Sequence, residues 1–360
     1  MNNYKLWYKV AVILAAIIVA LFIGSVIIIA VGGNVVTTYW IILSMPFKNL
    51  RSICEVLTRM IPLMIIALGI CVSSRCGINN IGAEGQMYMG VVASCAVAFA
   101  TAGMPRMVAI PLCILAGAVA GGLYGFVPGF LKAKLEVSEL LSTVMLNYVA
   151  TQFYLFCIRV PLLDPQEKTG TPMSARLPDS ASLHKFFRGA SLHQGIILAL
   201  ALAVLVYILL FKTTWGYKMR AAGASSRAAR YGGINVSKYL IIAMIISGAC
   251  AGMAGSVELM GVQGRAMSGI TSGYGFSGIV VALFGGLHPI LVIPAAFCFG
   301  ILLYSQVNLQ ILTAVPPNLV QTLQGAIILI IVSVQMVINN PYTEDRFRRR
   351  FFARAKREAR

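Results

Sequence analysis

Long apolar segments separated by short polar loops run through most of the chain. A membrane-spanning helix needs about 20 apolar residues, so each segment that approaches this length is a candidate span. About ten segments qualify, and two of them are short or interrupted. They are residues 10–31, 52–72, 86–102, 107–131, 140–160, 195–211, 239–260, 276–287, 289–307 and 319–338. The pattern predicts an all-α fold, a polytopic membrane helix bundle of about ten transmembrane segments.

Two parts of the chain, residues 52–160 and 239–338, each contain four of these segments. Because five segments separate their starts, the first part enters the bilayer from outside and the second from inside. Each part has a glycine-interrupted stretch, at 77–90 and at 261–286. Paired broken segments in inverted halves indicate a translocation path near the bilayer midplane. We therefore expect two inverted four-segment units, each with a glycine-broken segment.

The basic residues gather on one side of this predicted bundle. Lys5 and Lys9 precede the first segment, and two lysines lie in the turn at 132–134. The loop at 213–238 carries five basic residues and no acidic one, and residues 346–360 hold eight basic residues and one acidic residue. Cytoplasmic loops of membrane proteins are enriched in Lys and Arg. Both termini are therefore predicted to be cytoplasmic.

The same alternation places the loop at 161–194 outside the membrane. It contains four prolines and exceeds 30 residues, a length that is uncommon unless a loop is functional. It is either a contact for a partner that delivers solute or a passive cap over the bundle. We divide the chain into a transmembrane domain at 1–338, with this external loop and a cytoplasmic loop at 213–238, and a basic cytoplasmic tail at 339–360.

Composition narrows the class of protein. Hydrophobic residues make up 59% of the 360 residues and charged residues 11%, whereas soluble domains average about 25% charged residues. The formal net charge of +18 would suit nucleic acid, but the basic residues lie between apolar spans and at the C-terminus, which favours membrane orientation instead. The eight cysteines and three histidines are scattered, without a CxxC pair. Metal sites and disulfides therefore find no support.

The stretch CGINNIGAEGQMYMG at 76–90 places polar side chains at a depth where most neighbours are apolar. Asn80, Glu84 and Gln86 lie there among glycines. A carboxylate is costly inside a membrane unless it is paired, which makes Glu84 a candidate functional residue. The alternative is a structural carboxylate that caps freed backbone N–H groups at a helix start.

Two further polar residues fall inside predicted spans. Asn147 is placed to bond either a solute or a neighbouring helix. Arg59 is expected to pair with Glu55, one helical turn before it.

A second Gly/Ser-rich stretch occupies residues 261–289. Glu258 and Arg265 flank its start, seven residues apart, and would pair if the helix continued, although two intervening glycines argue against this. Tyr274 and Phe276 offer aromatic faces to a planar or ring-shaped solute, or are plain packing residues. The candidate residues of the translocation path are therefore Asn80, Glu84, Gln86, Asn147, Glu258, Tyr274 and Phe276.

Three stretches resemble one family of transport proteins. One stretch, at 221–256, reads AAGASSRAARYGGINVSKYLIIAMIISGACAGMAGS. It resembles the cytoplasmic coupling region and the following helix of bacterial ABC importer permeases of the ribose/branched-chain amino acid class. The signature of the simple-sugar/nucleoside branch of that class resembles INNIGAEGQMYMG at 78–90. The matching motif of the second half resembles GFSGIVVALFGGLHP at 275–289. Two positions depart from the family: Ser225–Ser226 stand where Asn-Pro is frequent, and Ser277 where Asp is common.

The resemblance implies a transport subunit, not an enzyme. Its implied partners are a second permease subunit, a cytoplasmic ATPase with nucleotide-binding domains, an external solute-binding lipoprotein and membrane lipids, but no nucleic acid. The chain has no GxxxxGK[ST] motif, so ATP and Mg are expected on the ATPase and no cofactor in this chain. The turn that couples to the ATPase would comprise Gly223, Arg227, Ala228, Ala229, Arg230, Gly232 and Gly233.

The predicted function is therefore import of nucleosides or simple sugars across the bacterial plasma membrane, driven by a separate ATPase subunit. The alternative is an ion-coupled secondary transporter in which Glu84 and Glu258 bind cations or protons. A membrane scaffold without transport activity is a third reading. The sequence leaves open which nucleoside or sugar is carried, whether the second permease is identical or different, and which polar residues contact the solute.

Overall fold

The fold comes from a computed structural model that describes residues 18–19, 21–30, 32–165, 170–187, 189–312, 322 and 325. Its regular structure is helical, as predicted, and these residues form no strand beyond isolated β-bridges in loops. The chain divides into two compact units, residues 49–301 and residues 1–48 with 302–360. The predicted segment at 319–338, the tail at 339–360 and most of the segment at 10–31 lie outside the described residues.

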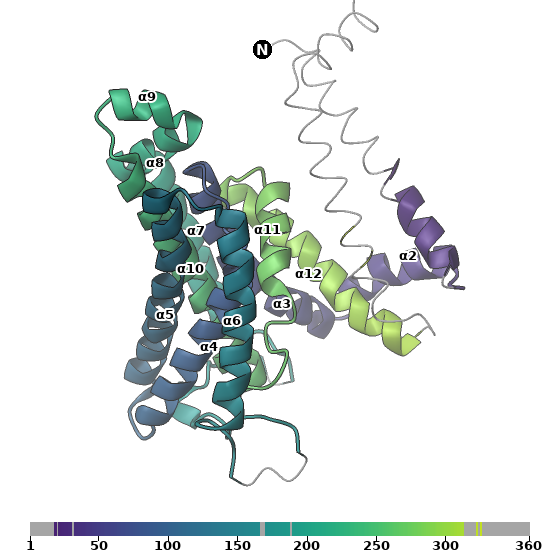
Figure 1. The fold of residues 1–360 in the computed structure, drawn as a ribbon. Helices are drawn as coiled ribbons and strands as arrows, with labels where there is room; N and C mark the ends of the chain where they lie inside the picture. The colour runs from purple at the N-terminus through teal and green to yellow at the C-terminus, as the bar shows by residue number, and fades with distance from the viewer. Residues whose placement is uncertain are drawn as a thin grey trace, which may run out of the picture. The chain divides into compact units, whose positions relative to one another are not determined.

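The larger unit is a bundle of helices of very different lengths (Figure 1). Its members are α3 (Leu50–Arg75), α4 (Ala83–Ala100), α5 (Arg106–Leu135), α6 (Glu139–Arg159), α7 (Gly195–Lys212), α8 (Thr214–Ala224), α9 (Ser226–Tyr231), α10 (Val236–Glu258), a π-helix (Leu259–Gln263), α11 (Tyr274–Phe284) and the first part of α12 (Pro289–Leu312).

Among the residues that the structure describes, six helices are long and apolar enough to cross a membrane, so the chain is a multi-pass membrane protein. They are Leu50–Arg75, Arg106–Leu135, Glu139–Arg159, Gly195–Lys212, Val236–Gln263 and Pro289–Gln306, and each coincides with a predicted segment. The predicted segments at 86–102 and 276–287 correspond to α4 and to the shorter α11, which has 11 residues. The total of about ten segments stays a prediction.

The smaller unit contains a helix that the search for 20-residue segments missed. Helix α2 (Val35–Ser44) has 10 residues, too few for a span. The side chain of Asn34 caps its start, because Oδ1 accepts a hydrogen bond of 3.1 Å from the backbone N–H of Thr37. Ile41 and Ile42 of this helix pack with Ile28 and Leu309.

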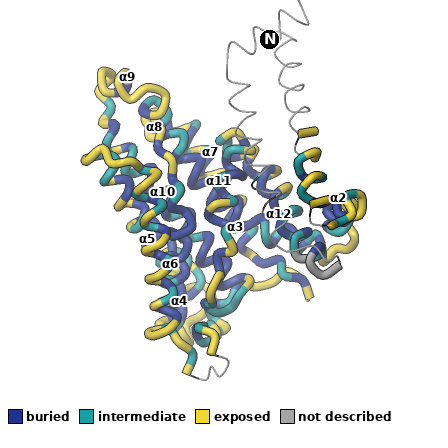
Figure 2. The backbone as a smooth tube through the Cα atoms, turned by 45° about the vertical axis from the view of Figure 1, so that its right-hand side comes forward, coloured by how far each residue is buried: buried dark blue, intermediate teal, exposed yellow. Residues whose placement is uncertain are grey.

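Helix α3 forms the core of the larger unit. Every residue from 60 to 73 is buried, and the helix packs against α7, α10 and α11. In Figure 2 its tube is mostly dark blue, whereas α5 and α6 carry long yellow stretches. A helix that is apolar on all sides belongs in the interior of a bundle. The exposed apolar side chains of α5, such as Leu115 and Leu123, suit contact with lipid or another subunit.

Glycines bring α5 and α10 into backbone contact. Gly117, Gly121 and Gly125 repeat every fourth residue on α5 and face Gly248 and Gly252 of α10. A Cβ atom at Gly121 would overlap the carbonyl oxygen of Gly248. Small residues at this spacing let membrane helices approach closely and gain van der Waals contact. This contact holds α10 in position for the site described below.

The loop at 161–194 is folded onto the chain that follows α10. The backbone N–H of Leu183 donates to the carbonyl of Met260 at 3.1 Å, and that of Leu177 to Gly264 at 2.9 Å. Ser174 donates in the same way to Ala266 at 2.8 Å. The loop thereby satisfies carbonyl groups that a broken helix leaves open. It is an integral part of the larger unit; its contact with a delivering partner stays a prediction.

We predict that Gly121→Ala destabilises the larger unit by about 1–3 kcal/mol, because the added methyl group forces α5 and α10 apart. Gly122→Ala is the matched control, since its nearest neighbour across the interface would lie 3.3 Å away, at the carbonyl oxygen of Ile245. The measurement is thermal unfolding of both variants in detergent. Equal midpoints for Gly121→Ala and the wild type would contradict the proposed backbone contact.

Candidate functional site

Two short helices begin against one another in the larger unit. Helix α4 follows a non-helical stretch at 77–82, and α11 follows one at 264–273. The backbone of Gly275 lies directly against Glu84, so that a Cβ on Gly275 would overlap the main chain and carboxylate of Glu84. Both glycine-rich stretches are therefore helix breaks, as the sequence predicts, and the N-termini of the two following helices meet.

The carboxylate of Glu84 lies at this meeting point. Its side chain is 8% exposed, and Oε2 accepts a hydrogen bond of 2.7 Å from the backbone N–H of Gly275. The Thr271 hydroxyl and the backbone N–H groups of Gly273 and Phe276 add further hydrogen bonds. The negative charge complements the positive end of the α11 dipole. Glu84 thus has the capping role that the sequence left open, although it caps α11 instead of its own helix; contact with solute stays a prediction.

Asn80 and Gln86 hold the first break together. Asn80 Nδ2 donates to Gln86 Oε1 at 2.7 Å and to Ser247 Oγ of α10 at 2.8 Å. Asn80 Oδ1 accepts from the backbone N–H of Gly82 at 3.0 Å. These three side chains are buried, and they satisfy one another, which is what buried polar groups require.

Asn147 joins α6 to the same break. Its Oδ1 accepts from the backbone N–H of Gly85 at 2.9 Å, and its Nδ2 donates to the carbonyl of Ile81 at 2.9 Å. Of the two alternatives left by the sequence, the structure therefore shows the bond to a neighbouring segment. Asn80, Gln86 and Asn147 therefore each have a protein partner at the first break.

A second polar cluster lies at the other break. Glu258, at the end of α10, is 3% exposed, and its carboxylate accepts a hydrogen bond of 3.3 Å from Gln263 Nε2. Arg59 of α3 interacts electrostatically with Glu258 and hydrogen-bonds the side chain of Tyr274. Arg59 and Gln263 are therefore the partners of Glu258. The structure shows no pairing of Glu258 with Arg265, because the π-helix and the turn at Gly264 interrupt the helix between these two residues.

The residues around this cluster differ in exposure. Tyr274 is buried, whereas Phe276, two residues later, is 49% exposed.

Glu55, expected to pair with Arg59, instead accepts a hydrogen bond of 2.5 Å from the hydroxyl of Ser191. Arg59 was not among the predicted path residues. The feature of the sequence that could have identified it is a single charged residue inside an apolar span.

The loop at 213–238 folds into two helices with defined caps. The Thr213 hydroxyl accepts from the backbone N–H of Gly216 at 3.1 Å, at the start of α8. Ser225 is the N-cap of α9 and accepts from the backbone N–H of Ala228 at 3.3 Å. Ser226 is then the first residue of α9. Since Asn is an equally good N-cap and Pro is favoured at the first helical position, the departure from Asn-Pro leaves the turn's function as a cap unchanged.

Most of the predicted coupling residues are exposed on this loop. A shallow groove is lined by Ser226, Arg227, Arg230 and Tyr231. Arg227, Ala228 and Arg230 are exposed, as are Gly223, Gly232 and Gly233, whereas Ala229 is buried. The structure therefore presents the predicted arginines to solvent and uses Ala229 for packing.

The inner face of the loop rests on the first break. Gly223 has no room for a side chain, because a Cβ would overlap the carbonyl oxygen of Arg75 and the backbone of Cys76. Arg75 in turn donates from Nε to the carbonyl of Leu287 at 3.0 Å and from Nη2 to Gly286 at 3.3 Å, in the turn that ends α11. The coupling loop is thus joined to the end of α3, to the start of the first break and to the end of α11.

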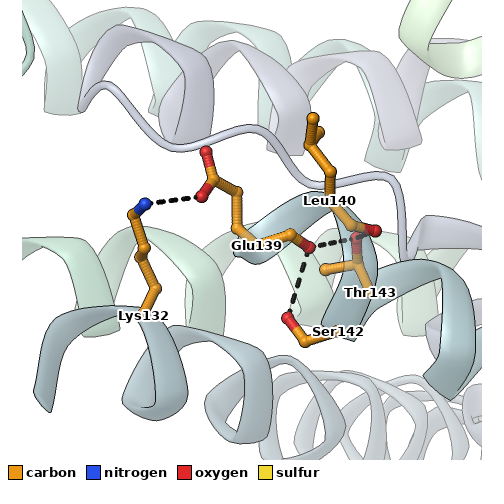
Figure 3. Close-up of polar contacts among 5 residues, drawn as sticks. All are labelled: Lys132, Glu139, Leu140, Ser142 and Thr143. Carbon is orange, nitrogen blue, oxygen red and sulfur yellow. Dashed lines mark hydrogen bonds and ion pairs between the residues drawn. The ribbon is translucent and has the colours of Figure 1, made fainter. Parts of the chain in front are cut away.

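A further contact fixes the turn between α5 and α6 (Figure 3). Lys132 Nζ and Glu139 Oε2 form an ion pair of 2.8 Å. The carbonyl of Glu139 also accepts hydrogen bonds from the hydroxyls of Ser142 at 3.3 Å and Thr143 at 2.6 Å. The pair is partly exposed, so it contributes little stability. The pair links the last turn of α5 to the first turn of α6, the helix that carries Asn147.

We predict that Glu84→Ala lowers both the yield of folded protein and transport, because it leaves the N–H groups at the start of α11 without an acceptor, at a cost of about 1–3 kcal/mol. Glu84→Gln keeps an acceptor oxygen and is expected to fold better than Glu84→Ala. Thermal unfolding in detergent and solute uptake measure the two effects. Full uptake and wild-type stability of Glu84→Ala would show that the carboxylate is dispensable.

Comparison with known proteins identifies the family. The family described as "Branched-chain amino acid transport system / permease component" matches residues 52–332. The guanosine ABC transporter permease protein NupP of Bacillus subtilis is 36% identical over 326 residues, which are 89% of this chain and 92% of NupP. The nucleoside ABC transporter permease protein NupB of Lactococcus lactis is 34% identical over 94% of each chain.

A more distant relative comes from an archaeon. The glucose ABC transporter permease protein TsgB13 of Haloferax volcanii is 29% identical over 91% of this chain and 88% of its own length. No solved structure matches the chain. The match over residues 52–332 includes both helix breaks and the coupling loop. This chain therefore belongs to the family of branched-chain amino acid transport system permease components, the membrane subunits of ABC transporters.

Proposed function

We propose that this chain is a transmembrane permease subunit of an importer that moves nucleosides or simple sugars across the bacterial plasma membrane. Its similarity to permeases named for guanosine, nucleosides and glucose supports this class of solute. The observation that carries the mechanism is the contact of the coupling loop, through Gly223, with the end of α3 and the first helix break. A displacement of this loop by a cytoplasmic partner would therefore be transmitted to the first helix break, inside the membrane.

The complete importer contains further subunits. A second permease, a cytoplasmic ATPase that holds ATP and Mg, and an external solute-binding lipoprotein complete it. The exposed arginines of α9 can form ion pairs with acidic residues on the ATPase. The small residues around these arginines allow the ATPase surface to approach the loop closely. The basic loop at 213–238 and the basic tail support a cytoplasmic position for both termini, since Lys and Arg are enriched on that side of a membrane.

The translocation path runs between two inverted units of the bundle. Helices α4 and α11 start at the contact between Glu84 and Gly275. Helix α11 ends at the coupling side, where Arg75 binds the carbonyls after it. Helix α4 runs toward the loop at 161–194, since Cys95 contacts Ser174 at 3.8 Å. Two half-helices that start together and run apart support the inverted arrangement, in which ATP-driven rocking of one unit against the other opens the path alternately.

An ion-coupled secondary transporter is the less favoured reading. Glu84 would have to exchange cations or protons during each cycle, but its carboxylate is bound to the N-terminus of α11. The relatives of this chain are named as ABC transporter permeases, which need an energising partner. The ATPase-dependent reading therefore accounts for more of the observations.

We predict that the double variant Arg227→Glu/Arg230→Glu abolishes binding of the ATPase while the permease folds normally, because both side chains are exposed and bear no structural contact to the core. Lys238→Glu, an exposed charge reversal at the start of α10, is the matched control and is expected to keep the ATPase. Co-purification of the ATPase with each variant is the measurement. Retention of the ATPase by the double variant at wild-type stoichiometry would contradict the docking role of α9.

The function itself is tested by uptake into vesicles that contain this chain, the second permease and the ATPase, with the binding protein outside. We expect uphill uptake of a labelled nucleoside or sugar with ATP, and none when the ATPase is omitted. Guanosine, cytidine, ribose and glucose are offered in parallel, so that the solute class is read directly. Uphill uptake by this chain alone on an ion gradient would overturn the proposal.

A further inference from the structure

We propose that Arg59, Glu258 and Gln263 form a recognition site for the hydroxyl groups of the solute, placed between the predicted external loop and the midpoint of the path. The inference rests on the proposed function and adds to it a set of binding residues and a requirement on the solute. Arg59 and Gln263 were not among the residues that the sequence predicted to line the translocation path.

Two parts of the chain that are distant in sequence bring these groups together. Arg59 comes from α3, Glu258 from the end of α10 and Gln263 from the end of the π-helix. Gln263 Nε2 donates to Glu258 Oε1 at 3.3 Å, while Arg59 acts on Glu258 electrostatically and hydrogen-bonds Tyr274. The cluster therefore presents a buried carboxylate beside a partly buried amide and a partly buried guanidinium.

The cluster is less well satisfied than the polar groups of the first break. The Nε atom of Arg59 is buried and has no hydrogen-bond partner. Nε2 of His193, a residue with no exposed surface, also lacks a partner, and it lies against Gly261 of the π-helix. Unpaired buried donors are costly, whereas Asn80, Gln86 and Asn147 find partners in the protein. A solute that enters this region would supply the missing acceptors.

The position of the cluster along α3 places it on the side opposite the coupling loop. Arg59 precedes Arg75, which touches the coupling loop, by 16 residues, or about 24 Å of helix. The predicted external loop reaches the same region: Ser191 binds Glu55 one turn before Arg59, and His193 packs on Gly261. A solute released by an external binding protein would thus meet this cluster before it reaches the helix break at Glu84.

The π-helix explains how the two polar residues come to share one site. It adds a residue to the turn after α10, so that Gln263 folds back onto Glu258. Gly261 at its centre leaves no room for a side chain, because His193 fills that space. Single π-turns inside α-helices are frequently found at functional sites.

The charges of the cluster indicate which solutes it accepts. Two carboxylates, Glu55 and Glu258, are matched by two basic side chains, Arg59 and the nearby Lys185, so the formal charges sum to zero. Burial, with the nearby charge of Lys185, lowers the pKa of His193 to about 4, so this imidazole adds no positive charge at neutral pH. The region therefore has no net positive charge to stabilise an anionic solute such as a phosphorylated sugar. A neutral solute with vicinal hydroxyls matches the set, since a carboxylate accepts two hydrogen bonds while a guanidinium and an amide donate.

The test compares uptake of a solute with and without its vicinal hydroxyls by the complete importer: guanosine against 2′,3′-dideoxyguanosine, or glucose against 3-deoxyglucose if glucose is the solute carried. Because the same binding protein delivers both compounds to every variant, a change in their uptake ratio belongs to the permease. We expect Glu258→Gln and Arg59→Lys to reduce kcat/KM about 10-fold for the hydroxylated solute and less than about 2-fold for its deoxy analogue. Asn147→Ala, which disturbs only the framework, is expected to reduce both by the same factor.

Equal losses for the two compounds in Glu258→Gln and Arg59→Lys would assign the cluster a structural role and overturn the inference. A second measurement uses the wild-type importer: an azido derivative of the transported solute, activated by light, is expected to label the segments around residues 59 and 258–263. Labelling confined to other segments would also overturn the inference. If the wild type carries neither nucleosides nor sugars, the proposed function fails; if it carries them and the variants keep the wild-type ratio, only the recognition site fails.

Discussion

Backbone groups freed by two helix breaks inside a membrane have to be satisfied by the protein, and the rest of this structure depends on that constraint. Glu84 supplies an acceptor to the start of α11, and Asn147 supplies both a donor and an acceptor to the start of α4. The loop at 161–194 pairs with carbonyls after α10. Each break is thus closed by groups from elsewhere in the chain, which is why the helices, the loop and the breaks form one unit.

The contacts at the two breaks also connect the loop at 213–238 to the middle of the bundle. The coupling loop touches the main chain at Arg75 and Cys76 through Gly223, and Arg75 binds the carbonyls that end α11. Helix α11 leads back to Glu84 at the meeting of the two half-helices. Displacement of the loop by an ATPase would therefore act on both breaks through direct contacts. The close glycine packing of α5 on α10 would keep these two helices together during such a displacement.

Several features were predictable from residues close together in the sequence. The apolar segments predicted the six long helices, and the glycine-rich stretches predicted both breaks. Serines at the start of α9 keep the cap that Asn-Pro would provide. The partners of the polar residues were not predictable in this way: Glu258 meets Arg59, which lies 199 residues earlier in the chain, and not Arg265. Helix α2 was missed because it is shorter than a span.

The sequence by itself determined where the chain is apolar, where glycines interrupt its helices and where positive charge gathers, because these depend on residue type and local spacing. Tertiary structure alone decided which helix Glu84 caps, which segments Asn147 joins and which charged side chain interacts with Glu258. A buried polar group needs a partner but does not specify one by its own identity. The choice is made by the packing of α3, α4, α6, α10 and α11, which brings distant segments within hydrogen-bonding distance.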